Sequence, residues 1–244
     1  GFITIGLISV VISPTPIVSF RSFVSILTYF SMFSFAYTFV RSREDVESIM
    51  KLIIYSSFIP FAVSAIQFVL PETSTTRDGF RLHGSFMHPN IFAFYLVLVA
   101  SVCFYCIKSD AVFFSKRFIR LCYVVIPLSA ICLIATQTRS AWIAFFAIFF
   151  IYGLLYERKY VIFVCCIGVL ALFLPFVQER VADLASDSQI TGSGGEKLNS
   201  YAWRKVVWLS SWDYIQNNMW FGHGYDTFSY YFLDFFILEE SKGF

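Results

Sequence analysis

Three arginines, Arg81, Arg139 and Arg204, are the residues of this sequence best suited to binding an anion. Arg139 lies in TQTRSAW at the start of an apolar run, where a guanidinium is costly unless it is paired. A guanidinium presents a planar fork of N–H donors that fits phosphate oxygens, so three of them on one side of a membrane suit a multiply charged anion. The same side chains can instead anchor the chain among lipid head groups. The sequence leaves both interpretations open.

The three histidines, His83, His88 and His223, form the second group with chemical potential. A neutral imidazole can take a proton from a sugar hydroxyl near physiological pH. A loop histidine can equally serve only as a hydrogen-bonding group. Both roles stay open for each of the three.

The acidic residues are notable for their spacing. No Asp-x-Asp pair occurs, although clustered carboxylates are what a metal-bound sugar-phosphate site usually requires. We therefore predict chemistry without a metal or other cofactor, in which arginines supply the electrostatic role of the metal.

The elements that must position these residues are membrane helices. The chain of 244 residues is 58% hydrophobic and only 14% charged, whereas globular domains are about 45–50% apolar and about 25% charged. A net charge of +2 is too small to suggest a nucleic-acid partner. Apolar runs long enough for spans are at residues 1–12, 17–40, 49–70, 90–108, 121–137, 140–156 and 160–177.

These runs predict an all-α, polytopic transmembrane helical bundle of about seven spans over residues 1–177. Residues 178–244 are then the start of a large polar loop. The chain begins without Met and stops in mid-pattern, so we expect a fragment that lacks one or both ends.

Lysine and arginine set the expected orientation. They gather in the connections near 41–51, 108–120 and 157–159, which fall on one side if the spans alternate. Basic connections face the cytoplasm. The segments 13–16, 71–89 and 137–139, and everything after 178, then face outward. All three arginines and all three histidines discussed above lie in these outward segments.

The outward loop is predicted to contain a helix at the membrane surface. Within residues 199–220, Trp208, Trp212, Ile215 and Met219 recur at helical spacing on one face. An apolar, tryptophan-rich face is typical of a helix that lies in the membrane interface. The following FGHGYDTF is a glycine-bounded turn.

Three segments, in this order, carry a resemblance to a known family: RLHGSFMHPNIFAFYL, TQTRSAW and RKVVWLSSWDYIQNNMWFGHGYDTF. Together they resemble the bacterial O-antigen ligase and O-antigen polymerase superfamily over roughly residues 80–230. The resemblance implies a multi-pass protein of the bacterial inner (cytoplasmic) membrane, with its active face and large loop in the periplasm. Its substrate would be a glycan linked to undecaprenyl pyrophosphate.

Within this family pattern, Arg139 matches an arginine at a span start, and Arg204 matches an arginine in a helix ahead of a G-x-G turn. Arg81 and Asn90 match the glycine-containing loop before an earlier span. The sequence departs from the pattern in one respect, because family ligases place a histidine beside an asparagine further along the large loop. No such pair occurs before Phe244, and His223 cannot be given that role on residue type alone.

The resemblance implies metal-independent, inverting glycosyl transfer, with a glycan repeat or the lipid A core as acceptor and membrane lipid as the surrounding partner. Arg139 and Arg204 are the predicted catalytic residues, since they would stabilise charge on the departing pyrophosphate. The predicted substrate-binding residues are Arg81, His83, His88, Asn90 and His223. The general base is unassigned.

Other functions remain compatible with the sequence. Ligase and polymerase differ only in their acceptor. A flippase or other transporter of lipid-linked polysaccharide also needs a basic outer vestibule, and Arg21 is the one charge near a span interior that would suit it. A non-catalytic assembly partner would tolerate loss of Arg139 and Arg204 together.

Overall fold

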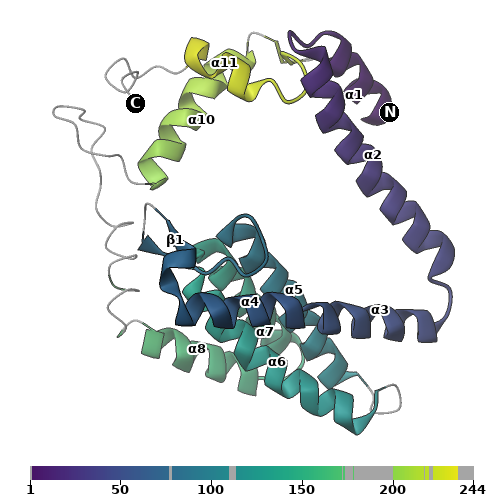
Figure 1. The fold of residues 1–244 in the computed structure, drawn as a ribbon, viewed down its shortest axis with the longest axis vertical. Coiled ribbons are helices and arrows are strands. Elements are labelled where there is room, and N and C mark those ends of the chain that lie inside the picture. The colour runs from purple at the N-terminus through teal and green to yellow at the C-terminus, as the bar shows by residue number, and fades with distance from the viewer. Residues whose placement is uncertain are drawn as a thin grey trace. The chain divides into compact units, whose positions relative to one another are not determined.

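The computed structural model describes residues 2–76, 79–109, 114–171, 173, 178, 200–216, 218–219 and 222–235. The regular elements of this part of the chain are α-helices, one short 3-10 helix, η1 (Pro71–Ser74), and a minimal antiparallel pair, β1 (Thr75–Thr76) with β2 (Gly79–Phe80). The chain divides into two compact units (Figure 1). The first consists of Gly1–Phe39 with Leu172–Phe244, and the second is Val40–Ala171. The predicted all-α class is confirmed.

Four of the described helical stretches are long and apolar enough to cross a membrane, so the chain is a multi-pass membrane protein. They are α2 (Pro16–Phe39), α3 (Arg43–Ser56) with α4 (Phe58–Val69), α5 (Pro89–Lys108) and α6 (Lys116–Ala135). The other three predicted spans coincide with shorter helices: α1 (Phe2–Val11), α7 (Arg139–Leu155) and α8 (Lys159–Ala171). Residues 172 and 174–177 of the last predicted span lie outside the described residues.

Two helices begin earlier than the apolar pattern predicted, because polar side chains cap them. The Ser42 hydroxyl accepts from the Asp45 backbone N–H at 3.1 Å, and the Asp45 carboxylate accepts from the Ser42 N–H at 2.9 Å. This capping box starts α3 at Arg43 rather than at residue 49. In the same way, the Ser115 hydroxyl caps α6, which starts at Lys116 rather than at 121.

Helix α5 is the centre of the second unit. It packs against α3, α6 and α7, and half of its twenty residues are buried (Figure 1). Phe92, Leu96 and Cys103 are fully buried there. Large apolar side chains on the outer faces, such as Ile131 of α6 and Ile143 of α7, are exposed, as expected for surfaces that face lipid.

The two ends of the second unit differ in chemistry. At one end, the Leu82 N–H donates to the Ala135 carbonyl at 3.0 Å, so the loop before α5 meets the end of α6. At the other end, Lys108 of α5 forms an ion pair with Glu157, in the turn between α7 and α8. Antiparallel packing therefore gathers the lysines at one end and the loop that contains Arg81 at the other, in agreement with the predicted alternation of the spans.

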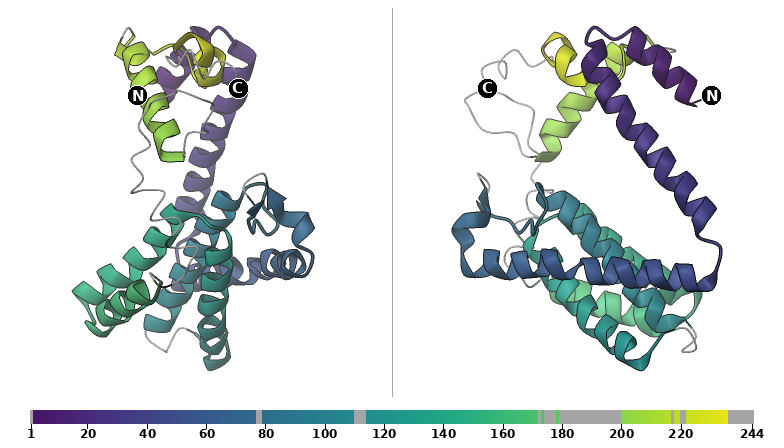
Figure 2. Two further views of the ribbon diagram at one scale, coloured as in Figure 1. Left: turned by 90° about the vertical axis from the view of Figure 1, so that its left-hand side faces the viewer. Right: turned by 45° about the vertical axis from the view of Figure 1, so that its right-hand side comes forward.

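The first unit joins the two ends of the chain. Helices α1 and α2 form a hairpin, in which Gly6 lies so close to Phe23 that a Cβ would be 2.5 Å from its ring. Helices α10 (Ser200–Gln216) and α11 (Phe228–Phe235) flank a turn whose Tyr225 N–H donates to the Ser9 carbonyl at 3.2 Å. The turn between α10 and α11, which leads into the yellow helix α11 of Figure 2, thus lies beside the purple N-terminal hairpin.

Candidate functional site

In the second unit, Arg81 joins the loop before α5 to the turn between α6 and α7. Its Nε donates to the Thr136 carbonyl at 3.2 Å, and its Nη2 donates to the Asn90 side-chain oxygen at 3.2 Å. The Thr138 hydroxyl donates to the same Asn90 oxygen at 3.1 Å. Two segments that are distant in the sequence, residues 81–90 and 136–138, therefore share one polar cluster at one end of the helices. We call Arg81, Asn90, Thr136 and Thr138 the Asn90 cluster.

Arg139 follows directly after this cluster. It is half-buried and is the first residue of α7. Gln137 adopts a left-handed conformation with φ of 54°, which forms the tight turn between α6 and α7, and its side chain donates to the Phe80 carbonyl at 3.1 Å. The Thr138 side chain makes no cap bond to α7. The positive end of the α7 dipole and the Arg139 charge thus lie together, an arrangement that favours an anion.

His83 is held by a buried glutamine. The Gln67 side-chain oxygen accepts from the backbone N–H groups of His83 at 3.3 Å and Gly84 at 3.0 Å, and its amide donates to the Gly84 carbonyl at 3.1 Å. His83 Nδ1 lies 2.9 Å from the Phe86 carbonyl oxygen and therefore carries the proton. The Gln67 amide nitrogen lies 3.2 Å from the other ring nitrogen, Nε2.

His88 is the N-cap of α5. Its Nδ1 accepts from the Asn90 backbone N–H at 3.1 Å, with Pro89 in the first helical position. Nδ1, which accepts the capping bond, holds the lone pair of the neutral ring. The other nitrogen, the exposed Nε2, therefore carries the proton and is a donor. In this conformation His88 can offer a hydrogen bond to a substrate but has no second lone pair to take a proton.

Arg204 belongs to the first unit, where it is exposed in α10. The face predicted to lie in the membrane interface is exposed too, with Trp208 at 66% and Met219 at 63% of full exposure. Exposed tryptophan and methionine along this segment agree with a surface that contacts lipid.

The G-x-G turn after α10 packs on the N-terminal hairpin. Gly222 and Gly224 have φ of 64° and 108°, values that favour glycine. At Gly224 a Cβ would also be 2.7 Å from the Cα of Ser13, so a larger residue cannot occupy this position without a shift. The turn thereby fixes His223 between the glycines.

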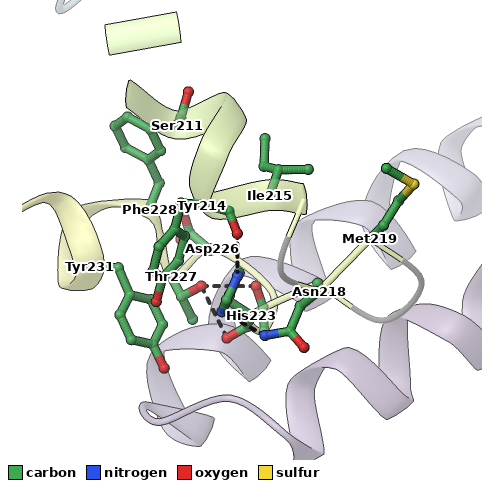
Figure 3. A pocket seen from close by; sticks show the side chains of 12 residues that line it. Ser211, Tyr214, Ile215, Asn218, Met219, His223, Asp226, Thr227, Phe228 and Tyr231 are labelled. Carbon is green, nitrogen blue, oxygen red and sulfur yellow. Dashed lines mark hydrogen bonds between the residues drawn. The ribbon is translucent and has the colours of Figure 1, made fainter. Parts of the chain in front are cut away.

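His223 has both ring nitrogens engaged within this turn. Its Nε2 donates to the Tyr214 carbonyl at 2.9 Å, and its Nδ1 accepts from the Asn218 amide at 3.3 Å (Figure 3). The imidazole stacks on the Tyr214 ring at 3.9 Å between centroids. This ring is therefore a fixed part of the turn, and its basic nitrogen is not available to an incoming hydroxyl in this conformation.

The structure thus brings together some of the predicted site residues. Arg81 and Asn90 are in direct contact, and Arg139 follows Thr138 of the same cluster. His83 and His88 lie in the loop that this cluster holds. Arg204 and His223 belong to the first unit. Among the described residues, no group of three or more His, Cys, Asp and Glu side chains is arranged to hold a metal ion.

Comparison with known protein families identifies the C-terminal half of the chain. A family model described as O-Antigen ligase matches residues 124–243, which include Arg139, Arg204 and the G-x-G turn. Residues 124–243 thus belong to the O-antigen ligase and O-antigen polymerase superfamily. The predicted superfamily is therefore confirmed. Comparisons with curated proteins and with solved structures find no match.

Membership of the O-antigen ligase family supports a role in processing lipid-linked polysaccharide, as a glycosyltransferase-like enzyme with lipid-linked glycan substrates. Arg81 and Asn90 lie outside the matched segment. Their contact with Thr138, inside that segment, links the upstream loop to the O-antigen ligase region.

Two residues that position this loop were not singled out in the sequence. Thr138 precedes Arg139 at a helix start, where Ser or Thr is a common N-cap residue, so this local pattern indicates its position. Gln67 is a long polar side chain within an apolar run, and a buried amide needs partners. Its partners His83 and Gly84 lie sixteen and seventeen residues further on, and no local pattern names them.

Proposed function

We propose that this chain transfers a glycan from undecaprenyl pyrophosphate to an acceptor hydroxyl on the periplasmic face of the bacterial inner membrane. The acceptor oxygen attacks the anomeric carbon, and a new C–O bond forms with inversion. The bond from that carbon to the pyrophosphate oxygen breaks, and its electron pair stays on the departing undecaprenyl pyrophosphate. The hydroxyl proton passes to a base that is not assigned.

The observation that carries this proposal is the placement of Arg139 within the O-antigen ligase segment. Arg139 starts α7 directly after a tight turn that the Asn90 cluster holds in place. Preorganised donors are most effective where charge develops in the transition state, and here that charge develops on the pyrophosphate. Arg204, within the same matched segment, is the second proposed clamp on this group.

The loop around Arg81 serves the sugar side in this proposal. Arg81 already donates to Asn90 and Thr136, so its main contribution is to hold the loop against the start of α7. His83 and His88 lie on this loop, and the exposed Nε2–H of His88 is a donor for a sugar oxygen. The proposed reaction uses arginines in place of a metal ion, so it is metal-independent.

Deletion of the gene in its host, followed by gel analysis of the surface polysaccharide, tests the proposal. If core with a single repeat unit accumulates, chain extension has failed and the acceptor is a new repeat. If bare core accumulates together with lipid-linked polymer, the acceptor is the lipid A core. An unchanged polysaccharide ladder would contradict the proposal for O-antigen.

A plasmid-borne copy then assigns the residues. We expect wild type to restore the ladder and Arg204→Ala to fail, while Lys205→Ala, on an exposed neighbouring residue of the same helix, restores it. Full restoration by a double variant that lacks Arg139 and Arg204 would favour an assembly partner over an enzyme.

A further inference from the structure

The first unit contains a pocket that the proposed function above does not use, although His223, a predicted substrate-binding residue, lines it. Its volume is about 290 Å³, and it lies between the C-terminal end of α10, the G-x-G turn and α11 (Figure 3). We propose that this pocket binds one neutral, hydroxyl-bearing sugar ring and is the acceptor-side subsite. This inference rests on the proposed function, whose acceptor it locates.

The size and walls of the pocket suit one sugar ring. Its volume is just below the range of drug-sized ligand pockets, about 300–1,000 Å³, as expected for a ligand of one ring. Tyr214, His223 and Tyr231 form an aromatic wall, with the Tyr231 ring centroid 5.4 Å from Tyr214 and 5.6 Å from His223. Aromatic rings offer a flat apolar surface to the C–H face of a pyranose, and tyrosine adds a polar edge.

Two oxygen atoms on the pocket wall are acceptors without a hydrogen bond from any described residue. Asp226 uses Oδ2 to accept from the Ser22 hydroxyl at 2.5 Å, which leaves Oδ1. Asn218 uses its amide nitrogen on His223, which leaves its side-chain oxygen. These hydrogen-bond acceptors suit a ligand with hydrogen-bond donors, such as the hydroxyl groups of a sugar.

Asp226 is fixed rather than mobile at this position. It adopts a left-handed conformation with φ of 56°, which a non-glycine residue rarely takes unless its surroundings hold it. Ser22 of α2 holds the carboxylate, and the hydroxyl of the next residue, Thr227, donates to the Gly224 carbonyl at 3.0 Å. A carboxylate oriented in this way is preorganised to accept from a hydroxyl.

The charge of Asp226 also separates this pocket from the proposed pyrophosphate site. A carboxylate repels phosphate, so the pocket suits an uncharged part of the substrate. Arg204 lies ten residues before Tyr214 on α10, which corresponds to about 15 Å along the helix axis. One helix thus carries a cationic end for the pyrophosphate and an acceptor-rich end for a neutral sugar.

Saturation-transfer NMR on the full chain in detergent tests this inference. The probes are methyl glucoside and methyl N-acetylglucosaminide as neutral rings, with methyl glucuronide as the anionic comparison. We expect both neutral probes to receive saturation from the wild type, and the glucuronide to receive less. Asp226→Asn and Tyr231→Ala should each weaken the neutral signal at least about five-fold, the effect of one lost hydrogen bond or ring contact.

Matched variants separate binding from folding. Tyr29→Ala removes an exposed tyrosine of α2 that does not line the pocket, and it should leave the signal unchanged. Tyr231→Phe keeps the ring and should retain binding within about two-fold, because the stacking surface is preserved. Equal signals from wild type, Asp226→Asn and Tyr231→Ala would overturn the inference. So would absence of any neutral signal, preference for the glucuronide, or equal loss in Tyr29→Ala and Tyr231→Ala.

The failure of this inference is distinguishable from failure of the proposed function. The pocket assignment alone is wrong if the polysaccharide ladder requires Arg139 and Arg204 while Asp226→Asn and Tyr231→Ala leave sugar binding unchanged. If the neutral sugars bind as expected while loss of both arginines leaves the ladder intact, the pocket binds sugar but the proposed transfer is wrong.

Discussion

The Asn90 side-chain oxygen accepts two hydrogen bonds, from Arg81 at 3.2 Å and from Thr138 at 3.1 Å. One acceptor thus joins the loop before α5 to the start of α7, where Arg139 lies. Because Thr138 directly precedes Arg139, the position of this oxygen determines the position of the first turn of α7. The proposed pyrophosphate clamp therefore depends on a residue that need not touch the substrate.

Asn90→Ala should impair both stability and transfer. It removes the shared acceptor and leaves two partly buried donors without it, which costs about 1–3 kcal/mol of folding free energy. Asn90→Asp keeps an acceptor oxygen in place and should retain the fold. Thermal unfolding in detergent measures the first effect, and the polysaccharide ladder measures the second. Wild-type stability and a full polysaccharide ladder from Asn90→Ala would contradict a role of the Asn90 cluster in folding and in transfer.

Gly84→Ala should destabilise the loop that contains His83. Gly84 has a φ of 58°, and an added Cβ would be 3.0 Å from the Phe92 ring. The left-handed conformation alone costs an alanine about 1–2 kcal/mol. Gly168→Ala in α8 is the matched control, because nothing lies within 4 Å of its added Cβ and alanine favours a helix. We expect a lower unfolding temperature for Gly84→Ala only, and equal temperatures for the two variants would contradict the described loop.

The membrane helices were predictable from the sequence because they follow local rules. Apolar runs predicted α2, α5 and α6, and lysine and arginine predicted which connections share a side. The exact helix starts were not predictable from apolarity, because Ser42 and Ser115 extend α3 and α6 into charged residues by capping.

The contacts that position the site were not predictable, because they join residues that are far apart in the sequence. Arg81 meets Thr136 across 55 residues, and Ser22 meets Asp226 across 204. No spacing rule relates such pairs. The histidines show a second limit: their types suggested proton transfer, whereas their hydrogen-bond partners, Phe86, Asn90 and Tyr214, define which nitrogen carries the proton.

The end of the second unit opposite to Arg81 gives a prediction about pH. Ion pairs with Lys108 and Lys159 lower the pKa of the Glu157 carboxyl from about 4.5 to about 2. A carboxylate whose pKa is lowered by folding contributes stability above its unfolded pKa, and loses that contribution as the pH falls through the folded value. Glu157→Gln should therefore lower the unfolding temperature at pH 7 in detergent.

The difference between wild type and Glu157→Gln should shrink as the pH falls from about 4.5 towards 2. Glu44→Gln, in the first turn of α3, is the control for a general charge effect. A difference between wild type and Glu157→Gln that is constant across this pH range would contradict the ion-pair account.

The most direct test of the proposed transfer uses the purified chain with undecaprenyl-pyrophosphate-linked polysaccharide and acceptor extracted from the host. The assay counts undecaprenyl pyrophosphate released against acceptor glycosylated. We expect equal amounts of the two products from wild type. Arg139→Lys keeps the charge but loses the fork, and should be about 10²–10³-fold slower. Arg158→Lys, on an exposed arginine at the other end of the unit, should match wild type. Wild-type rates from Arg139→Lys would contradict the arginine clamp, and acceptor-independent movement of polysaccharide without pyrophosphate release would contradict glycosyl transfer itself.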